Sequence, residues 1–265
     1  EMRDNVMDQL TDSSVRRQFT AFYRGKRMPL RAGVILRSLT FRRGDLFNQD
    51  KYNESMMNIS ASGLYSLTDY VFTPRDTTAS CDTLDLTINT VFDKALDGSI
   101  EGNFTSKSND RMGPGLVIDL TKRNAFKGGE KLNLKLNGSY EWQTGKSVQG
   151  NSSLINSYDY GGSISIDYPR LELPWNKRYR LYSIPSTSFS IAAYCMNRAD
   201  YFKMTTVSAG VTYKFQTSAT SKHEISPFLL DFEILQNKTA RFDSIINANP
   251  ALYVSMRNQF IPKMK

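Results

Sequence analysis

Apolar and polar side chains alternate without exception between residues 131 and 142. One side of this segment carries apolar, aromatic or glycine residues, and the other carries Lys131, Asn133, Lys135, Asn137, Ser139 and Glu141. Strict alternation indicates a β-strand with one apolar and one polar face. The segment is longer than an average strand of ~5–6 residues and long enough for the ~9–11 residues that cross a bilayer.

The same period continues through most of the chain after residue 96. Three further segments alternate clearly: 158–168, 207–216 and 228–235. Four alternate less regularly: 98–109, 116–124, 186–197 and 252–261. We therefore predict about eight antiparallel strands. Tight turns are expected at 124–129 and 217–221, and long polar loops at 144–157 and 237–249.

Long strands joined by alternating short and long connections are typical of membrane β-barrels. In such a barrel we expect the apolar face to contact lipid. The predicted lipid-facing residues are Leu132, Leu134, Leu136, Tyr140, Trp142, Val207, Val211, Tyr213 and Phe215. A soluble β-sandwich is the alternative, although its turns recur every ~8–12 residues, which is closer than the spacing here.

The first part of the chain has a different pattern. Helical spacing predicts helices at 29–39 and 48–62, the second ending at Gly63. Strands are expected at 67–74 and 84–92. The sequence thus predicts two domains, residues 1–96 and 97–265.

Composition changes this picture little. The net charge is +8 and 40% of residues are hydrophobic, which is compatible with a barrel because only alternate residues face lipid. No apolar run reaches the ~18 residues of a membrane helix. Residues 15–43 hold nine Lys and Arg and no acid; they are either a solvated basic face or a contact for anionic lipid headgroups or an acidic partner. Nucleic acid is not expected as a partner.

The sequence offers no catalytic constellation. His223 is the only histidine and lies beside Glu224 at an expected turn, where a solvated pair is the simpler interpretation. Cys81 and Cys195 are far apart in sequence and show no metal-ligand spacing. We therefore expect no enzyme activity, no cofactor and no metal.

Motifs in the first domain suggest a family. Gly44, the Gly63-Leu64-Tyr65 step and the Leu84-Asp85-Leu86 strand occupy the positions of the signature of a polypeptide-transport-associated (POTRA) domain. Residues 98–142 resemble the first three barrel strands of the BamA/TamA family of outer-membrane assembly factors. Within them, residues 124–129 (NAFKGG) resemble that family's periplasmic turn.

The resemblance implies an α+β POTRA domain of order β-α-α-β-β followed by antiparallel transmembrane β-barrel strands. The first POTRA strand would lie within residues 18–24 or upstream. Family barrels have sixteen strands, and the family's Arg-Gly-Phe loop motif is absent here. We therefore expect the last POTRA domain with the first half of a barrel, and a complete small barrel is the alternative.

The first barrel strand is unusual, because it is rich in glycine and serine and poor in apolar residues. A weakly packed strand at a barrel seam would leave backbone groups that bind an incoming strand. The residues of this predicted client-binding seam are Gly98, Ser99, Ile100, Glu101, Gly102, Asn103, Phe104 and Thr105. A second edge is expected in the POTRA domain, at Leu67, Thr68, Asp69, Tyr70, Val71 and Phe72.

By resemblance, the function is insertion of client β-barrels into the outer membrane, with the N-terminal domain in the periplasm. The expected partners are unfolded outer-membrane proteins, periplasmic accessory lipoproteins or chaperones, and outer-membrane lipid. Two alternatives remain: a protein export pore of the two-partner secretion type, and a small structural or adhesive barrel.

Overall fold

A computed structural model describes residues 10, 12–15, 19–76, 82–108, 111–143, 157–172, 181–198, 201–248 and 258–265. The predicted loop at 144–157, except for its last residue, lies outside these ranges, as do Cys81 and two arginines of the basic segment, Arg16 and Arg17.

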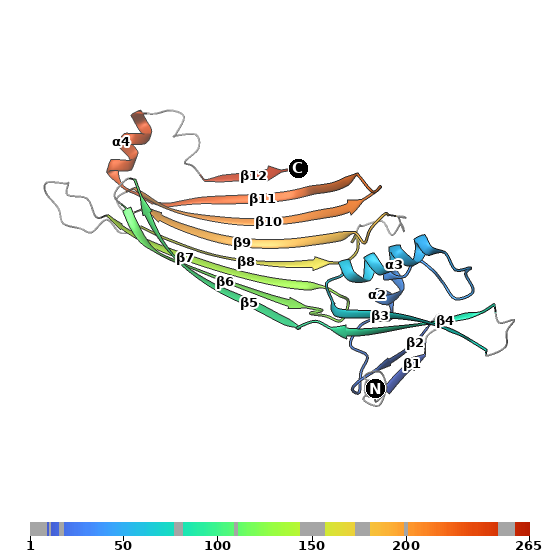
Figure 1. Ribbon diagram of the computed structural model, residues 1–265. Coiled ribbons are helices and arrows are strands. Elements are labelled where there is room, and N and C mark those ends of the chain that lie inside the picture. Colours follow the sequence, from blue (N-terminus) through green and yellow to red (C-terminus); the bar gives the residue numbers. More distant parts are fainter. Residues whose placement is uncertain are drawn as a thin grey trace.

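The chain is mostly antiparallel β-structure, and its largest element is one eight-stranded sheet (Figure 1). Its strands are β5 (Leu96–Lys107), β6 (Arg111–Arg123), β7 (Lys131–Gln143), β8 (Ser157–Tyr168), β9 (Ser186–Arg198), β10 (Phe202–Gln216), β11 (Lys222–Lys238) and β12 (Gln259–Lys263). Each strand pairs with its neighbours in sequence, so β5 and β12 are the two outermost strands. The prediction of about eight antiparallel strands is confirmed.

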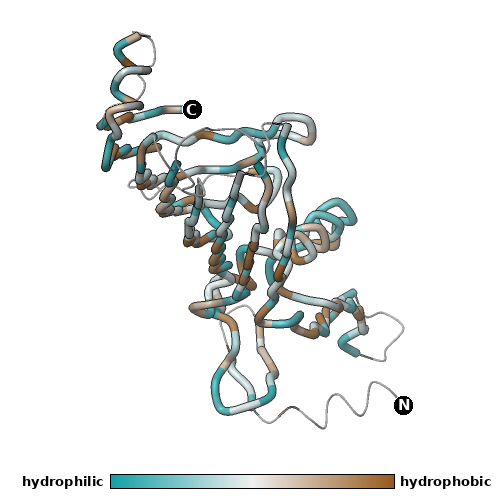
Figure 2. Tube along the Cα trace, turned by 90° about the vertical axis from the view of Figure 1, so that its left-hand side faces the viewer, coloured by the Kyte–Doolittle hydropathy of each residue, from teal (hydrophilic) through white to brown (hydrophobic). Residues whose placement is uncertain are grey.

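The strand register brings apolar residues into continuous rows across the sheet. One row runs through directly paired residues of all eight strands: Ile100, Ile118, Leu136, Gly162, Ala193, Val207, Phe232 and Phe260. The adjacent row lies on the opposite face and is mainly polar: Ser99, Asp119, Lys135, Ser163, Ala192, Ser208, Asp231 and Ile261. The alternation along the strands is visible as alternating colour in Figure 2. The sheet therefore has one apolar and one mainly polar face.

The elements that precede β5 in the chain lie at one end of this sheet (Figure 1). They are the hairpin β1 (Asp12–Val15) with β2 (Thr20–Tyr23), the helices α2 (Ala32–Ser38) and α3 (Gln49–Ala61), and the two-stranded sheet of β3 (Tyr65–Pro74) with β4 (Leu84–Phe92). The two predicted helices and two predicted strands are present. β2 falls within residues 18–24, but it pairs with β1 and not with β3 or β4. The division into domains 1–96 and 97–265 stays a prediction, and the large sheet begins at Leu96.

Local chemistry sets the ends of α3. The Asn48 side chain accepts hydrogen bonds from the backbone N–H groups of Asp50 (2.8 Å) and Lys51 (3.0 Å), which satisfies donors that have no partner inside the helix. Ser62 ends the helix, and Gly63 follows in the left-handed region with φ of 61°. The predicted stop at Gly63 is confirmed.

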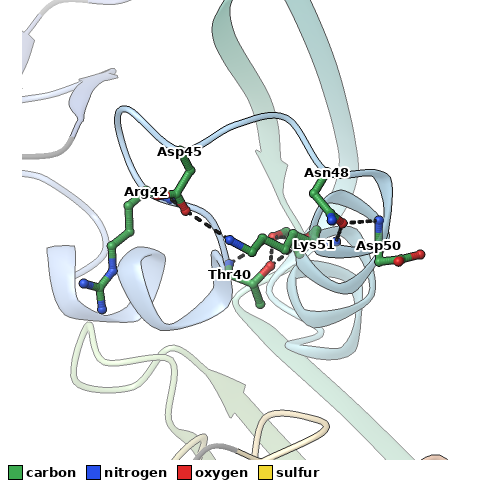
Figure 3. A network of polar contacts seen from close by, with 7 residues as sticks. Thr40, Arg42, Asp45, Asn48, Asp50 and Lys51 are labelled. Atoms are coloured by element: carbon green, nitrogen blue, oxygen red, sulfur yellow. Dashed lines mark hydrogen bonds and ion pairs between the residues drawn. The ribbon is translucent and has the colours of Figure 1, made fainter.

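Polar contacts also fix the α2–α3 connection (Figure 3). The Thr40 hydroxyl donates to the Lys51 carbonyl (2.6 Å), and the Lys51 ammonium lies 3.3 Å from a carboxylate oxygen of Asp45. The Arg42 backbone N–H donates to the same carboxylate and, together with Lys51, lowers the pKa of Asp45. These contacts fold the loop back onto the first turn of α3.

One predicted loop contains a helix. The connection after β11 is long, as expected, but residues Ala240–Ala248 form α4. The Thr239 hydroxyl accepts the Phe242 backbone N–H (3.3 Å), and Phe242 and Ile246 are buried on one side of the helix. The Phe242 ring packs 4.9 Å, centroid to centroid, from that of Phe202 at the start of β10. The loop prediction was wrong here because the helical spacing of Phe242, Ile245 and Ile246 covers only one turn between polar residues, which is a weak pattern.

Candidate functional site

The predicted seam residues, 98–105, all lie in β5. This strand is hydrogen-bonded to β6 on one side, and within the described residues it has no partner strand on the other. Every residue of β5 is exposed, including the apolar side chains of Ile100 (75%) and Phe104 (61%). A strand of this kind presents a row of backbone donors and acceptors to its surroundings.

The glycines of β5 explain part of this exposure. A Cβ added to Gly102 would have no heavy atom within 4 Å, so no neighbouring side chain packs on the strand at this position. At Gly98 an added Cβ would come 2.8 Å from the end of the Leu120 side chain, which would have to shift. The middle of β5 thus contributes little side-chain packing to its contact with β6.

The residues predicted to face lipid occupy the apolar face of the sheet. Five of them lie in β7 and four in β10, and the register places both sets on the face defined by the Ile100–Phe260 row. Large apolar side chains on this face are exposed, among them Ile191 and Phe228, each 65% exposed. An exposed apolar surface that extends over eight strands is typical of proteins that contact lipid or another protein.

Two of the predicted residues lie at the edge of this face nearest the helices. The Tyr213 hydroxyl donates to the carbonyl of Glu172 in the β8–β9 connection (3.2 Å). The Phe215 ring stacks on His223, whose Nε2 lies 3.0 Å from the Thr217 hydroxyl. His223 is therefore part of the β10–β11 turn region, as its sequence context predicted.

The opposite face is rich in charge pairs. The two terminal guanidinium nitrogens of Arg198 donate to the two carboxylate oxygens of Asp159 (2.9 and 3.1 Å). The Lys263 ammonium lies 2.8 Å from a carboxylate oxygen of Asp231. Amide and hydroxyl groups extend this pattern, since Asn133 donates to Asp167 (2.9 Å). Such a surface suits water and not lipid.

The predicted POTRA edge residues, 67–72, lie in β3. β3 pairs with β4 on one side, and its Tyr70 and Phe72 rings each lie 5.5 Å from Tyr52 of α3. Burial raises the pKa of Tyr70 and, in the same strand, raises the pKa of Tyr65 to about 12. Leu67, on the face turned away from α3, is exposed. β3 is thus anchored by one face, and among the described residues its second edge has no partner strand.

The β6–β7 turn is the point where the sheet meets the N-terminal elements. The Arg31 backbone N–H donates to the Lys127 carbonyl (2.7 Å), and the Asn124 side-chain amide donates to the Pro29 carbonyl (3.0 Å). The buried residues Leu30, Val34 and Leu64 form a small apolar core beside these contacts. The sequence predicted the turn but not its contact with the first helix, because nothing in a local pattern reports a neighbour more than 90 residues away.

The described residues hold neither a membrane-spanning helix nor a cluster of metal-ligating side chains. None of their helices is both long and apolar enough to cross a membrane. In the same part of the chain, no group of three or more His, Cys, Asp or Glu side chains is placed to bind a metal ion.

Comparisons with protein-family models, with curated proteins and with solved structures find no match to this chain. The interpretation of the site therefore rests on its geometry and on the sequence motifs described above.

Proposed function

We propose that this chain is part of an outer-membrane assembly factor of the BamA/TamA type, which folds client β-barrels into the outer membrane. The proposal joins a POTRA domain, residues 1–96, to the first strands of a transmembrane barrel, residues 97–265. β5 would be the strand to which a client adds. The observation that carries the proposal is an exposed edge strand beside an exposed apolar face.

The physical basis is backbone hydrogen bonding in lipid. An unpaired N–H or C=O group in the hydrocarbon costs several kcal/mol, so a client strand near a free edge gains by pairing with it. The exposed edge of β5 supplies such groups along twelve residues. Folding of the client provides the driving force, and the assembly factor needs no nucleotide or other cofactor for this step.

The apolar face defines the environment in which β5 would act. Its exposed Ile100 and Phe104 lie on the same side as the paired residues Ile118 and Pro114 of β6. We propose that this side contacts acyl chains and that the charge-paired face borders water. β3 would provide a second edge, open to periplasmic lipoproteins, chaperones or unfolded clients.

Gly102→Pro tests the proposal. Proline removes an N–H donor from β5 and restricts its backbone, so assembly of other barrel proteins should fall when this variant replaces the native protein in its host. Gly102→Ala is the matched control, because the added methyl group enters open space. The measurement is the amount of several folded barrel proteins in the outer membrane, at equal amounts of each variant.

The same experiment separates the alternatives. Loss of many barrel proteins in Gly102→Pro supports the assembly function. Normal amounts of all of them contradict it. Loss of one exported substrate alone would instead favour an export pore.

A further inference from the structure

The edge strand is joined to the N-terminal elements by a very short linker. β4 ends at Phe92 and β5 begins at Leu96, so only Asp93, Lys94 and Ala95 separate the small sheet from the large one. The Asp93 backbone N–H donates to the Leu64 carbonyl (2.9 Å), and Leu64 belongs to the apolar core under α2. A displacement of the N-terminal elements must therefore pull on the first residues of β5.

Arg123, the last residue of β6, makes two contacts with this linker and one with the start of β5. Its backbone N–H donates to the Ala95 carbonyl (2.8 Å). Its guanidinium forms a hydrogen-bonded ion pair with Asp93 and lies 3.6 Å from the Asp97 carboxylate. The planar fork of arginine allows contact with two carboxylates at once, which the single ammonium of lysine does less well.

The rest of β5 has few contacts of comparable strength. The backbone of β5 pairs with β6 along its length, but Gly102 leaves the middle of the strand without side-chain packing and all residues of β5 are exposed. At the far end, Lys107 forms an ion pair with Glu141 of β7, reaching across β6. β5 is therefore fixed by charge at both ends, and only the near end, at Arg123, is also connected to the N-terminal elements.

We propose that Arg123 is a positioning residue that latches the near end of β5 to β6. Through Asp93 it links the end of β4 to the sheet, and through Asp97 it fixes the start of the edge strand. Movement of β4 that breaks these pairs frees the near end of β5 and exposes further backbone groups. The consequence for clients rests on the function proposed above, whereas the latch itself does not.

Disulfide cross-linking between β5 and β6 measures the latch directly. Ser99 and Asp119 are directly paired, and Cα atoms of such pairs lie ~4.5–5.5 Å apart, within the range of a disulfide. The full chain carries Ser99→Cys and Asp119→Cys in a background with Cys81→Ser and Cys195→Ser. We expect Arg123→Gln to slow disulfide formation about two- to five-fold, the range of an exposed ion pair, and high salt to reproduce part of this effect.

Two further variants exclude a general loss of structure. Arg123→Lys keeps the charge and should restore part of the cross-linking rate. Asn133→Cys with Ser165→Cys, a direct pair between the interior strands β7 and β8, should cross-link equally with and without Arg123→Gln. An unchanged rate for the β5–β6 pair, or an equal slowing of both pairs, would overturn the latch.

Client assembly and cross-linking are both measured in a chain that carries Asp93→Asn. This substitution weakens the latch and leaves the sequence of β5 unaltered. Faster or slower assembly together with reduced cross-linking supports both the latch and the proposed function. Reduced cross-linking with unchanged assembly supports the latch and contradicts a role of β5 in client insertion.

Discussion

Gly129 lies where the β6–β7 turn approaches the core beneath α2. Its φ is 79°, a left-handed conformation that glycine adopts easily and other residues adopt at a cost. A Cβ there would also come 3.2 to 3.4 Å from side-chain atoms of Pro169, Leu64 and Val34. Both the backbone conformation and the close packing require glycine at this position.

We expect Gly129→Ala to loosen the contact between the turn and the N-terminal elements, with a loss of stability of about 1–3 kcal/mol. Gly44→Ala is the control, because Gly44 has a similar φ of 90° but open space around it. The measurement is thermal unfolding of the full chain in detergent micelles. If Gly44→Ala lowers the unfolding temperature as much as Gly129→Ala, backbone strain alone explains the effect and the packing argument is wrong.

Among the helices and strands, predictions succeeded where the local pattern of apolar and polar residues was long and regular. The alternation from Lys131 to Trp142 gave β7 nearly to the residue, and the helical spacing of residues 48–62 with the stop at Gly63 gave α3. α4 was missed, because it is a helix of nine residues whose large apolar side chains span only one turn. β2 is a different case, since its position was expected but its partner β1 was not.

Phe242→Ala tests what stabilises α4. The ring is buried and packs on Phe202, so its removal should destabilise the helix locally by about 2–4 kcal/mol and speed limited proteolysis between residues 239 and 248. Asn247→Ala, at an exposed position of the same helix, should leave the cleavage rate unchanged. Equal cleavage of the Phe242→Ala and native chains would show that local helix propensity is sufficient.

For the whole molecule, the sheet separates two sets of connections. The β6–β7 and β10–β11 turns lie at the end that also carries α2 and α3, and α4 lies at the other end (Figure 1). If the sheet spans the outer membrane as we propose, these two ends face opposite compartments. The continuous apolar face between them would then lie in the bilayer.

Site-specific labelling tests this arrangement. In cells with an intact outer membrane, a membrane-impermeant maleimide should label Asn247→Cys in α4 and not Thr220→Cys in the β10–β11 turn, both exposed positions. Permeabilising the outer membrane should make the second cysteine reactive, and a chain with Cys81→Ser and Cys195→Ser alone is the blank. Equal labelling of both sites in intact cells would contradict a membrane-spanning sheet.

Local sequence patterns were enough to predict the long strands of the sheet, its two different faces and both ends of α3 to within a residue. These features depend on residues within a few positions of one another, and side chains on a strand alternate whatever the strand pairs with. The tertiary structure, by contrast, sets the register that aligns the apolar residues of eight strands into rows. It also decided the docking of residues 124–129 on α2 and the contacts of Arg123 with Asp93 and Asp97. Such contacts join residues far apart in the chain, and their energy depends on geometry that no local pattern encodes.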